Sequence, residues 1–215
     1  MARISIIGGH GKVAMRLSRL LSHEGHEVTA WIRSSAQSFY VRETGAKPII
    51  VNVEPLSAET MAGLFKGEDA VVWSAGAGGG DPRRTRAVDR DAAIRSMDAA
   101  ALAGVARYVM VSWFYSRPDH GVPSDVPFYH YAEAKAAADS YLQGTDLDWT
   151  ILGPSSLTED PGTGMIELDG ERSQVTRDDV AQVAAEVLAR PETIGKIINF
   201  NNGPTPIAEA LGTLA

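Results

Sequence analysis

The sequence predicts an α/β fold, a doubly wound and mainly parallel sheet with helices on both faces. Two observations lead to this prediction. Short runs rich in β-branched residues alternate with helical patterns along most of the chain, as in parallel strands joined by crossover helices. The first unit is the clearest. Residues 4–7 are isoleucine except for Ser5, three of the next four residues are glycine, and a helical pattern with leucines on one side follows.

The later elements continue this alternation. After the first strand, we expect strands at residues 27–32, 47–53, 69–73, 107–112, 148–152 and 196–201. We expect helices from the glycines to about residue 24, from residue 34 or 35 to 44, and at 57–65, 81–103, 128–142, 176–190 and 206–211. Residues 165–168 and 174–175 are expected to pair as a small accessory sheet.

The chain has 215 residues and shows no internal repeat and no linker-like change in composition. We therefore expect a single domain over residues 1–215. Its substrate side is expected within residues 113–127 and 153–175. The first of these segments is a long loop with three prolines and three aromatic residues, and loops of this length in compact domains are often functional.

Composition excludes several classes of protein. The sequence contains no cysteine, which excludes disulfides, thiolate catalysis and cysteine–metal sites. The net charge of −7 argues against nucleic-acid binding, and no apolar run reaches the length of about 18 residues that a membrane helix needs. Because the first strand follows Met1 directly, we expect no leader and a cytoplasmic location. We expect no metal, because the zinc pattern H-E-x-x-H is absent.

The three glycines after the first strand predict a phosphate-binding turn. Gly8 allows the chain to reverse, Gly11 allows the backbone to approach a pyrophosphate, and Ala14 allows the helix to pack against its strand. The amide groups and dipole at the start of that helix would hold the anion. The spacing is G-x-x-G-x-x-A, so an ordinary β–α turn is the alternative. The expected contacts are Gly8, Gly9, His10, Gly11, Lys12 and Val13.

The residue that ends the second strand indicates which dinucleotide binds. An acidic residue there would bond the ribose 2′-hydroxyl, whereas arginine accepts a 2′-phosphate. The sequence has Arg33 followed by Ser34 and no acid, so NADP(H) is favoured over NAD(H). A solvated arginine is the alternative. The ends of the next two strands would complete the site with Asn52, Val53, Ser74, Ala75, Gly76 and Ala77.

Tyr131 and Lys135 are four residues apart and therefore lie on one helix face. A lysine ammonium near a phenol favours the phenolate, so this tyrosine would exchange a proton with a carbonyl or alcohol. An exposed pair on an alanine-rich helix is the alternative. Nearby, Trp113, Phe114 and Tyr115 either line a pocket for a flat substrate or pack in the core, and His130 is a candidate substrate contact.

Taken together, these segments resemble the atypical short-chain dehydrogenase/reductases. The resemblance is closest to the small NAD(P)H-binding group that includes NmrA-like and biliverdin- or flavin-reductase-like proteins. The matching pieces are Ile-Ile-Gly-Gly-His-Gly-Lys-Val-Ala, Val-Thr-Ala-Trp-Ile-Arg-Ser, Glu-Asp-Ala-Val-Val-Trp-Ser-Ala-Gly-Ala-Gly, Val-Asp-Arg-Asp-Ala-Ala-Ile, Val-Ala-Arg-Tyr-Val-Met-Val-Ser, Tyr131-x-x-x-Lys135 and Asp-Trp-Thr-Ile-Leu-Gly-Pro.

The resemblance implies a Rossmann-like fold that binds NADP through the first glycine loop and Arg33. It also implies that the nicotinamide lies near Ser112, Tyr131 and Lys135. Two positions depart from the family pattern. Trp113 replaces a second serine, and Gly153 stands where relatives often have arginine. The segment implied to flank the nicotinamide is Pro154, Ser155, Ser156 and Leu157.

The resulting hypothesis is an NADP(H)-binding oxidoreductase that transfers hydride to a small carbonyl, quinone or flavin-like acceptor. Tyr131 would supply the proton, Lys135 would lower the pKa of the phenol, and Ser112 would orient the acceptor. A non-catalytic NADP(H) redox sensor is the first alternative, and a sugar-nucleotide epimerase or dehydratase is the second. The expected partner is a small-molecule substrate, and the sequence leaves open whether the protein is a monomer or a homodimer.

Overall fold

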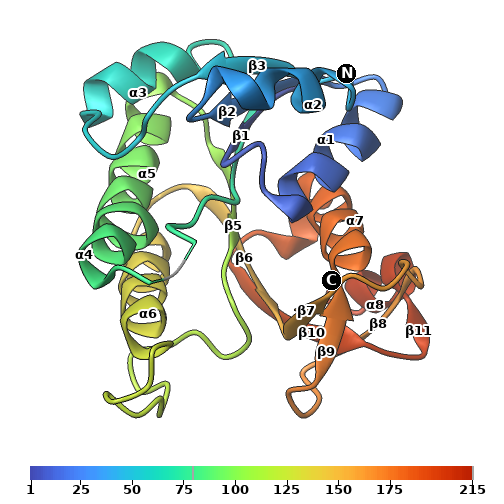
Figure 1. The fold of residues 1–215 in the computed structure, drawn as a ribbon. Helices are drawn as coiled ribbons and strands as arrows, with labels where there is room; N and C mark the ends of the chain where they lie inside the picture. The colour runs from blue at the N-terminus through green and yellow to red at the C-terminus, as the bar shows by residue number, and fades with distance from the viewer. Residues whose placement is uncertain (79, 215) are drawn as a thin grey trace.

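The computed structural model describes residues 1–78 and 80–214. Within these residues, nine strands form one sheet in the order β11-β8-β10-β6-β5-β4-β1-β2-β3, which Figure 1 shows in relation to the helices. The strands are β1 Arg3–Ile7, β2 Glu27–Ile32, β3 Lys47–Ile50, β4 Ala70–Trp73, β5 Arg107–Val111, β6 Asp148–Pro154, β8 Met165–Leu168, β10 Lys196–Asn202 and β11 Thr205–Pro206. A separate pair consists of β7 Ser156–Thr158 and β9 Gln174–Thr176.

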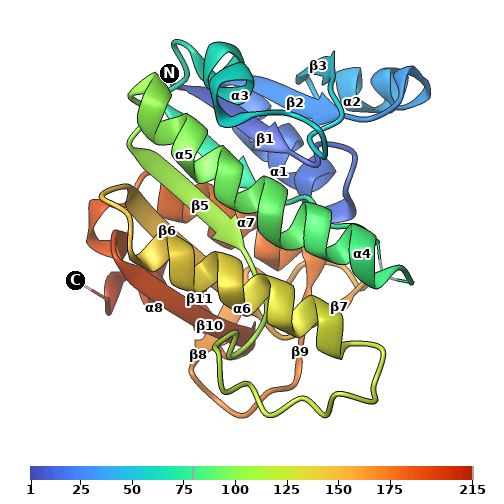
Figure 2. The ribbon, with the colours of Figure 1, turned by 90° about the vertical axis from the view of Figure 1, so that its left-hand side faces the viewer.

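The helices connect these strands and cover both faces of the sheet. The longer ones are α1 Lys12–His23, α3 Ala58–Phe65, α5 Ala93–Ala103, α6 Tyr129–Gln143 and α7 Arg177–Leu188. The shorter ones are α2 Ser38–Arg42, α4 Pro82–Thr85, α8 Ile207–Gly212 and the 3₁₀ turns η1 Ser35–Gln37 and η3 Pro191–Thr193. A π-helical segment, η2 Arg86–Ala92, joins α4 to α5, so one long helix has a widened turn in its first half (Figure 2).

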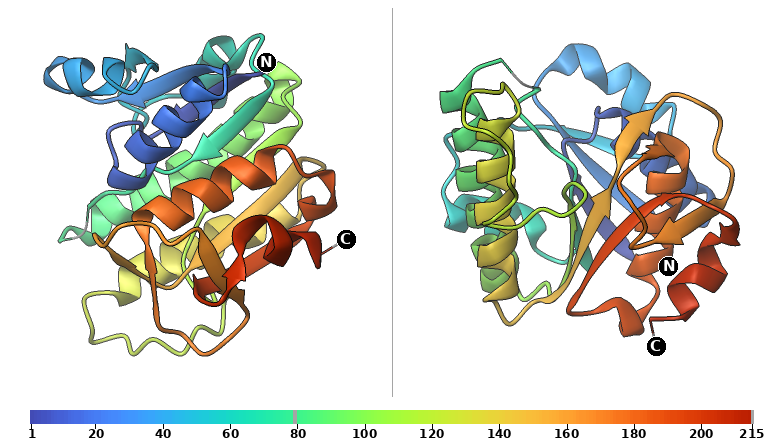
Figure 3. Two further views of the ribbon diagram at one scale, coloured as in Figure 1. Left: turned by 90° about the vertical axis from the view of Figure 1, so that its right-hand side faces the viewer. Right: turned by 90° about the horizontal axis from the view of Figure 1, so that it is seen from below.

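The sheet separates two hydrophobic cores. One core lies on the side of α1 and α7 and contains Ile4 and Ile6 of β1. The other lies on the side of α3, α5 and α6 and contains Ile7, Trp31 and Trp73. The right-hand view in Figure 3 shows the helices in two layers with the strands between them. A strand that is buried on both faces needs apolar residues at nearly every position, which explains the isoleucine-rich sequence of β1.

The prediction of a doubly wound, mainly parallel sheet is confirmed. The strands from β3 to β10 in sheet order pair in parallel, and β8 and β11 add an antiparallel edge. The predicted pairing of residues 165–168 with 174–175 is wrong. The first segment, β8, pairs with β10 and covers the exposed edge of the sheet, whereas β9 pairs in parallel with β7. An unpaired edge strand offers a row of hydrogen-bonding groups, which β8 satisfies.

Two negative results concern the described part of the chain. Every helix in it is too short or too polar to cross a membrane. Its histidine, aspartate and glutamate side chains form no group of three or more that would hold a metal ion.

Candidate functional site

The glycine turn between β1 and α1 packs closely against the loop that follows β4. Gly8 has a φ of 83°, and a Cβ atom at this residue would lie 2.5 Å from the Cα atom of Ala75. A Cβ atom on Gly11 would lie 3.1 Å from the carbonyl oxygen of Gly8. Gly8 therefore requires glycine because of its φ and its neighbour, whereas a side chain on Gly11 would make a tight contact with the turn. The turn has the close approach of backbones that the glycine spacing predicts.

The start of α1 is suited to an anion. Gly11 is the N-cap residue, and no side chain in the described residues caps the helix. The first-turn amides therefore lack the partners that a capping side chain would give them, and the positive end of the helix dipole adds to their attraction for an anion. A phosphate group at this position would satisfy these amides. The residues present therefore fit the pyrophosphate of a dinucleotide.

A cavity of about 240 Å³ opens beside this turn, at the carboxyl ends of β1, β2, β3 and β4. In a doubly wound sheet this is the place where ligands bind, because the chain winds in opposite directions from β1. Its lining includes the predicted residues Gly8, His10, Gly11, Arg33, Val53, Ser74, Ala75 and Gly76. The predicted residues Gly9, Lys12, Val13, Ser34, Asn52 and Ala77 are not part of the lining.

Arg33 and Ser34 have different tasks in the structure. Arg33 is exposed and lines the cavity at the end of β2, where a 2′-phosphate would be recognised. Ser34 forms a capping box with Gln37 at the start of η1, as its position before a helix predicts. Gln37 also lines the cavity and lies 3.3 Å from the ring of His10.

Two charged residues of the cavity were missed by the sequence analysis. Arg84 donates from Nε to Glu54 at 3.0 Å and from Nη1 to the carbonyl of Ala77 at 2.9 Å. Both Arg84 and Glu54 line the cavity. They come from segments 30 residues apart and carry no motif, so only the fold brings them together.

A second polar cluster lies in the core below α6. Lys135 is 1% exposed and donates to the carbonyl of Val111 at 2.9 Å. Asp89 and Asp139 are each 1% exposed, and their negative charges act on Lys135. Burial lowers the pKa of Lys135, and the two carboxylates oppose this shift. Burying a lysine and two aspartates is costly unless their charges compensate one another, so we treat the three residues as one buried charge cluster.

Asp89 connects this cluster to the cavity beside the glycine turn. Its Oδ2 accepts a hydrogen bond from the amide of Ala77 at 3.0 Å. A Cβ atom on Gly76 would lie 3.0 Å from its Oδ1. Burial raises the pKa of Asp89, while the Ala77 amide and Lys135 act against this shift. A carboxylate of the buried cluster therefore contacts and holds the loop that lines the cavity.

Asp139 connects the same cluster to the loop after β5. Its carboxylate accepts hydrogen bonds from the hydroxyls of Ser112 and Ser116, the second at 2.5 Å. All three side chains are buried, and burial raises the pKa of Asp139. Trp113 occupies the position where a second serine was expected, and Ser116 supplies a serine hydroxyl three residues later. Asp139 and Ser116 were missed, although Asp139 follows Lys135 by one helical turn.

Tyr131 is partly exposed, and its ring lies 5.2 Å from that of Phe128. Desolvation raises the pKa of the phenol, and the charges of Asp89 and Asp139 raise it further. This direction is opposite to the one that the Tyr–Lys spacing predicts, so the expectation that Lys135 lowers the pKa is wrong for this structure. The main reason is desolvation of the phenol, to which the charges of the two carboxylates add. Tyr131 is thus held as a protonated phenol.

The aromatic residues after β5 divide into core and surface. Phe114 is 1% exposed and packs in the interior, whereas Tyr115 is 45% exposed. Trp113 packs edge-on against Phe128 at 5.1 Å between ring centroids. His130 is exposed and lies in a separate groove between α4 and α6, which shares no lining residue with the cavity beside the glycine turn.

The segment expected beside the nicotinamide is only partly available. Pro154 and Ser155 are buried, and the Ser155 hydroxyl donates to Asn201 at 2.5 Å. Ser156 and Leu157 are exposed and belong to β7. Ser155 is therefore committed to a structural hydrogen bond.

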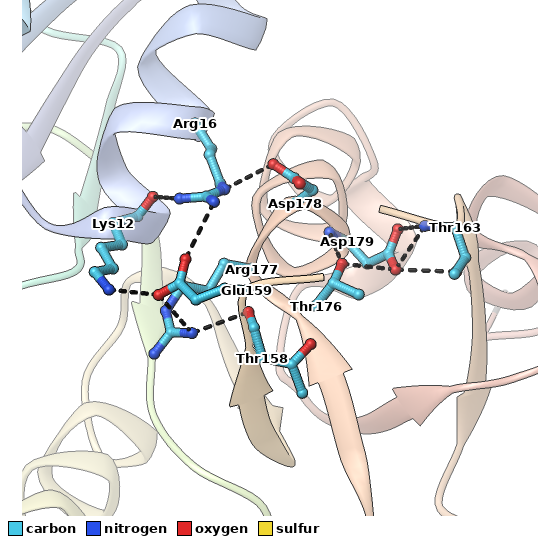
Figure 4. Close-up of polar contacts among 9 residues, drawn as sticks. All are labelled: Lys12, Arg16, Thr158, Glu159, Thr163, Thr176, Arg177, Asp178 and Asp179. Carbon is cyan, nitrogen blue, oxygen red and sulfur yellow. Dashed lines mark hydrogen bonds and ion pairs between the residues drawn. The ribbon is translucent and has the colours of Figure 1, made fainter. Parts of the chain in front are cut away.

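An ion-pair cluster joins the start of α1 to the chain after β7 (Figure 4). Glu159 contacts Lys12 at 2.5 Å, Arg177 at 3.1 Å and Arg16 at 3.4 Å. The hydrogen bond from Lys12 is the main reason why the pKa of Glu159 is lowered. Lys12, which was predicted to contact the cofactor, is directed to this carboxylate.

Comparison with known proteins identifies the family. Residues 8–191 match the model of a family described as NAD(P)H-binding. The chain belongs to this NAD(P)H-binding family, which confirms the resemblance drawn from the sequence. The match supports a nicotinamide cofactor and leaves the choice between NAD and NADP to the residues of the cavity.

Three similar proteins extend this result. The "Uncharacterized sugar epimerase YhfK" of Bacillus subtilis (strain 168) is 34% identical over 99% of this chain and 100% of its own. A solved structure from Bacillus halodurans, named for NAD-dependent epimerases/dehydratases, is 33% identical, covers 99% of this chain and 100% of its own, and has a TM-score of 0.91. The oxidoreductase ylbE from Lactococcus lactis is 32% identical, with 99% and 96% coverage and a TM-score of 0.86.

Proposed function

We propose that the protein is an NADP(H)-dependent reductase of a small carbonyl, quinone or flavin-like acceptor. The observation that carries this proposal is the contact of Asp89 with the loop that lines the cofactor cavity. Through Asp89, the buried cluster of Lys135, Asp89 and Asp139 adjoins the cavity in which the dinucleotide would bind, and the charges of the two aspartates act on Tyr131. A proton donor beside a hydride donor is what carbonyl reduction requires.

The residues of the cavity would bind the cofactor by three kinds of contact. The first-turn amides of α1 would receive the pyrophosphate. Arg33 would pair with the 2′-phosphate of NADP, since no acidic residue ends β2. Gly76 and its neighbours would leave room for the nicotinamide ribose. The reduced nicotinamide supplies a hydride when it is bound.

In this mechanism Tyr131 is the proton donor. The phenol is protonated at neutral pH and its pKa is raised further, so Tyr131 can give a proton to a developing alkoxide, which is a stronger base. The charges of Lys135, Asp89 and Asp139 set the electrostatic potential around this phenol. Ser112 donates its hydroxyl hydrogen bond to Asp139, so its oxygen would act toward a substrate as an acceptor rather than as a donor.

A test follows the oxidation of NADPH by the purified protein with a panel of quinones, flavins and aldehydes. We expect turnover with at least one acceptor class. Tyr131→Phe should reduce kcat by about tenfold or more and leave the Kd for NADPH unchanged. Tyr129→Phe, two residues earlier on the same helix, is the matched control and should retain activity. Tight binding of NADPH without turnover of any acceptor would instead favour a redox sensor.

The names of two relatives favour a second candidate, a sugar-nucleotide epimerase or dehydratase. Such a reaction begins when a base removes a proton from a sugar hydroxyl. A tyrosine whose pKa is raised is poorly suited to act as that base. Incubation with NAD and a panel of nucleotide sugars separates the two candidates. Formation of an epimer or a dehydrated product, without net oxidation of NADPH, would overturn the reductase proposal.

A further inference from the structure

A groove of about 350 Å³ lies between α4–η2 and α6, apart from the cofactor cavity. Figure 2 shows these helices side by side on one face of the molecule. None of the residues that line the groove lines the cofactor cavity. We propose that this groove binds a small organic anion that carries two or more phosphate or carboxylate groups.

The first argument is the distribution of arginines along the helix. Residues 83–95 contain five arginines, and they divide by direction. Arg84 and Arg95 turn toward the chain after β3, where Arg84 donates to the Glu54 side chain and Arg95 donates to the carbonyls of residues 53, 54 and 56. The other three line the groove, namely Arg83, Arg86 and Arg90.

These three arginines follow the spacing i, i+3 and i+7, so they lie on one helix face. The side chains of Arg83 and Arg86 are exposed and make no ion pair or hydrogen bond with the described residues. Arg90 contacts the carboxylate of its neighbour Asp91 at 2.6 Å. Two guanidinium groups therefore point at the groove with their donors available, in a protein whose net charge is −7.

The opposite wall comes from one face of α6. His130, Glu133, Ala134 and Ala137 have the spacing i, i+3, i+4 and i+7 and line the groove. The two alanines give it an apolar floor without bulk. Glu133 is the one acidic residue among the described lining residues, and its carboxylate is engaged by the ring of His120 at 2.8 Å.

The shape and chemistry together specify the ligand class. Guanidinium groups recognise phosphate and carboxylate through paired hydrogen bonds. Three arginines along two turns of the helix offer more donors than one phosphate or carboxylate group accepts, so a ligand with two or more anionic groups uses the whole row. The volume of the hollow matches a small molecule. A flat acidic protein surface would not enter it, so a small polyanion is the occupant that fits.

The test titrates the protein with inorganic tripolyphosphate and, separately, with citrate, by calorimetry in a low-salt buffer. We expect one anion to bind at the groove with saturation, in addition to any anion held at the start of α1. Arg83→Gln with Arg86→Gln should weaken it by about tenfold or more. The matched control is Arg19→Gln with Arg42→Gln, which removes the same charge from exposed positions elsewhere. The stronger of the two anions identifies whether phosphate or carboxylate is preferred.

A further variant distinguishes this groove from the cofactor site. Arg33→Ala, in the cofactor cavity, should weaken NADPH and leave tripolyphosphate binding at the groove unchanged. In the unaltered protein, methyl NMR signals of Ala134 and Ala137 should shift on addition of tripolyphosphate, a readout that needs no substitution. The proposal is overturned if neither anion binds with saturation, if both double variants weaken binding equally, or if only Arg33→Ala weakens it. Failure of NADPH binding alone would overturn the proposed cofactor and not this site.

Discussion

A Cβ atom on Gly153 would overlap Oδ1 of Asn199. The same amide oxygen accepts a hydrogen bond from the backbone of Tyr115 at 3.0 Å. Tyr115 has a φ of 60°, a conformation that a non-glycine residue adopts only when its surroundings hold it. Because Gly153 has no side chain, Asn199 has the space to accept the hydrogen bond that holds the start of the 113–127 loop. This is why a larger side chain, such as the arginine that the family resemblance implies at this position, has no room here.

We therefore predict that Gly153→Ala destabilises the protein by about 1–3 kcal/mol, the usual cost of an added methyl group in a packed site. Chemical denaturation of the two proteins measures the difference. Gly63→Ala is the matched control, because a Cβ atom there meets nothing within 4 Å on helix α3. It should be neutral or stabilising by up to about 1 kcal/mol. Equal stability of Gly153→Ala and the unaltered protein would contradict this explanation.

The parts of the fold that the sequence predicts are those with local signals. The glycine turn, the isoleucine-rich β1 and the cap at Ser34 each depend on neighbouring residues, and the structure has all three. The pairing of β8 and β9 depends on partners that lie elsewhere in the chain. No periodicity within residues 165–175 identifies those partners, so the predicted accessory pair was wrong.

The candidate site divides in the same way. Lys135 is predicted from its spacing to Tyr131, but its electrostatic surroundings are tertiary. Asp89 comes from a π-helical turn, and Ser116 comes from a loop. Desolvation of the phenol and the charges of Asp89 and Asp139 reverse the expected shift in the pKa of Tyr131. The spacing of Asp139 from Lys135 is a local signal that the sequence does contain.

The position of Arg33 predicts a preference for NADP over NAD. Titration of the purified protein should give at least about a tenfold lower Kd for NADP, and Arg33→Ala should reduce this gap, since a charge-assisted pair with the 2′-phosphate is lost. The Kd for NAD should change little. Arg42→Ala, an exposed arginine of α2 outside the cavity, is the control. Equal affinities for NADP and NAD in the unaltered protein would contradict the role of Arg33.

The raised pKa of Tyr131 predicts how activity depends on pH. A phenol acts as a proton donor only while it is protonated, so activity falls as the pH rises through its pKa. Because that pKa lies above its ordinary value of about 10, kcat should not decline between about pH 7 and pH 9. The measurement is kcat at saturating NADPH across this range. A decline with a midpoint below about pH 9 would mean that Lys135 lowers the pKa after all.

Asp139 is predicted to be a positioning residue. Its charge contributes to the raised pKa of Tyr131, so Asp139→Asn should lower that pKa and move the alkaline decline of kcat to lower pH. The substitution also releases the hydroxyls of Ser112 and Ser116. We expect a reduced kcat with a nearly unchanged Kd for NADPH. Asp146→Asn, outside the cluster, should leave the profile in place. A reduced kcat with an unshifted pH profile would indicate a merely structural role.

Asp179 is predicted to stabilise the fold more than its neighbour Asp178. Burial alone would raise the pKa of Asp179, but hydrogen bonds from the amides of Thr163 and Gly164 and from the side chains of Thr176 and Asn202 outweigh it and lower the pKa. The carboxylate ties the chain before β8 to the start of α7, as Figure 4 shows for its contacts with Thr163 and Thr176.

Asp179→Asn should therefore reduce the free energy of unfolding by about 2 kcal/mol at pH 7, because hydrogen bonds to a charged group are lost. Asp178→Asn removes a surface ion pair with Arg16 at 2.7 Å and should cost less than about 1 kcal/mol. A lowered pKa gives stability that is present above the unfolded value of about 3.9 and is lost as the pH falls through the folded value. The difference in the free energy of unfolding between Asp179→Asn and the unaltered protein, measured with urea, should thus become smaller near pH 3. A gap that stays constant from pH 7 to pH 3 would mean that the charge of Asp179 is not what stabilises this junction.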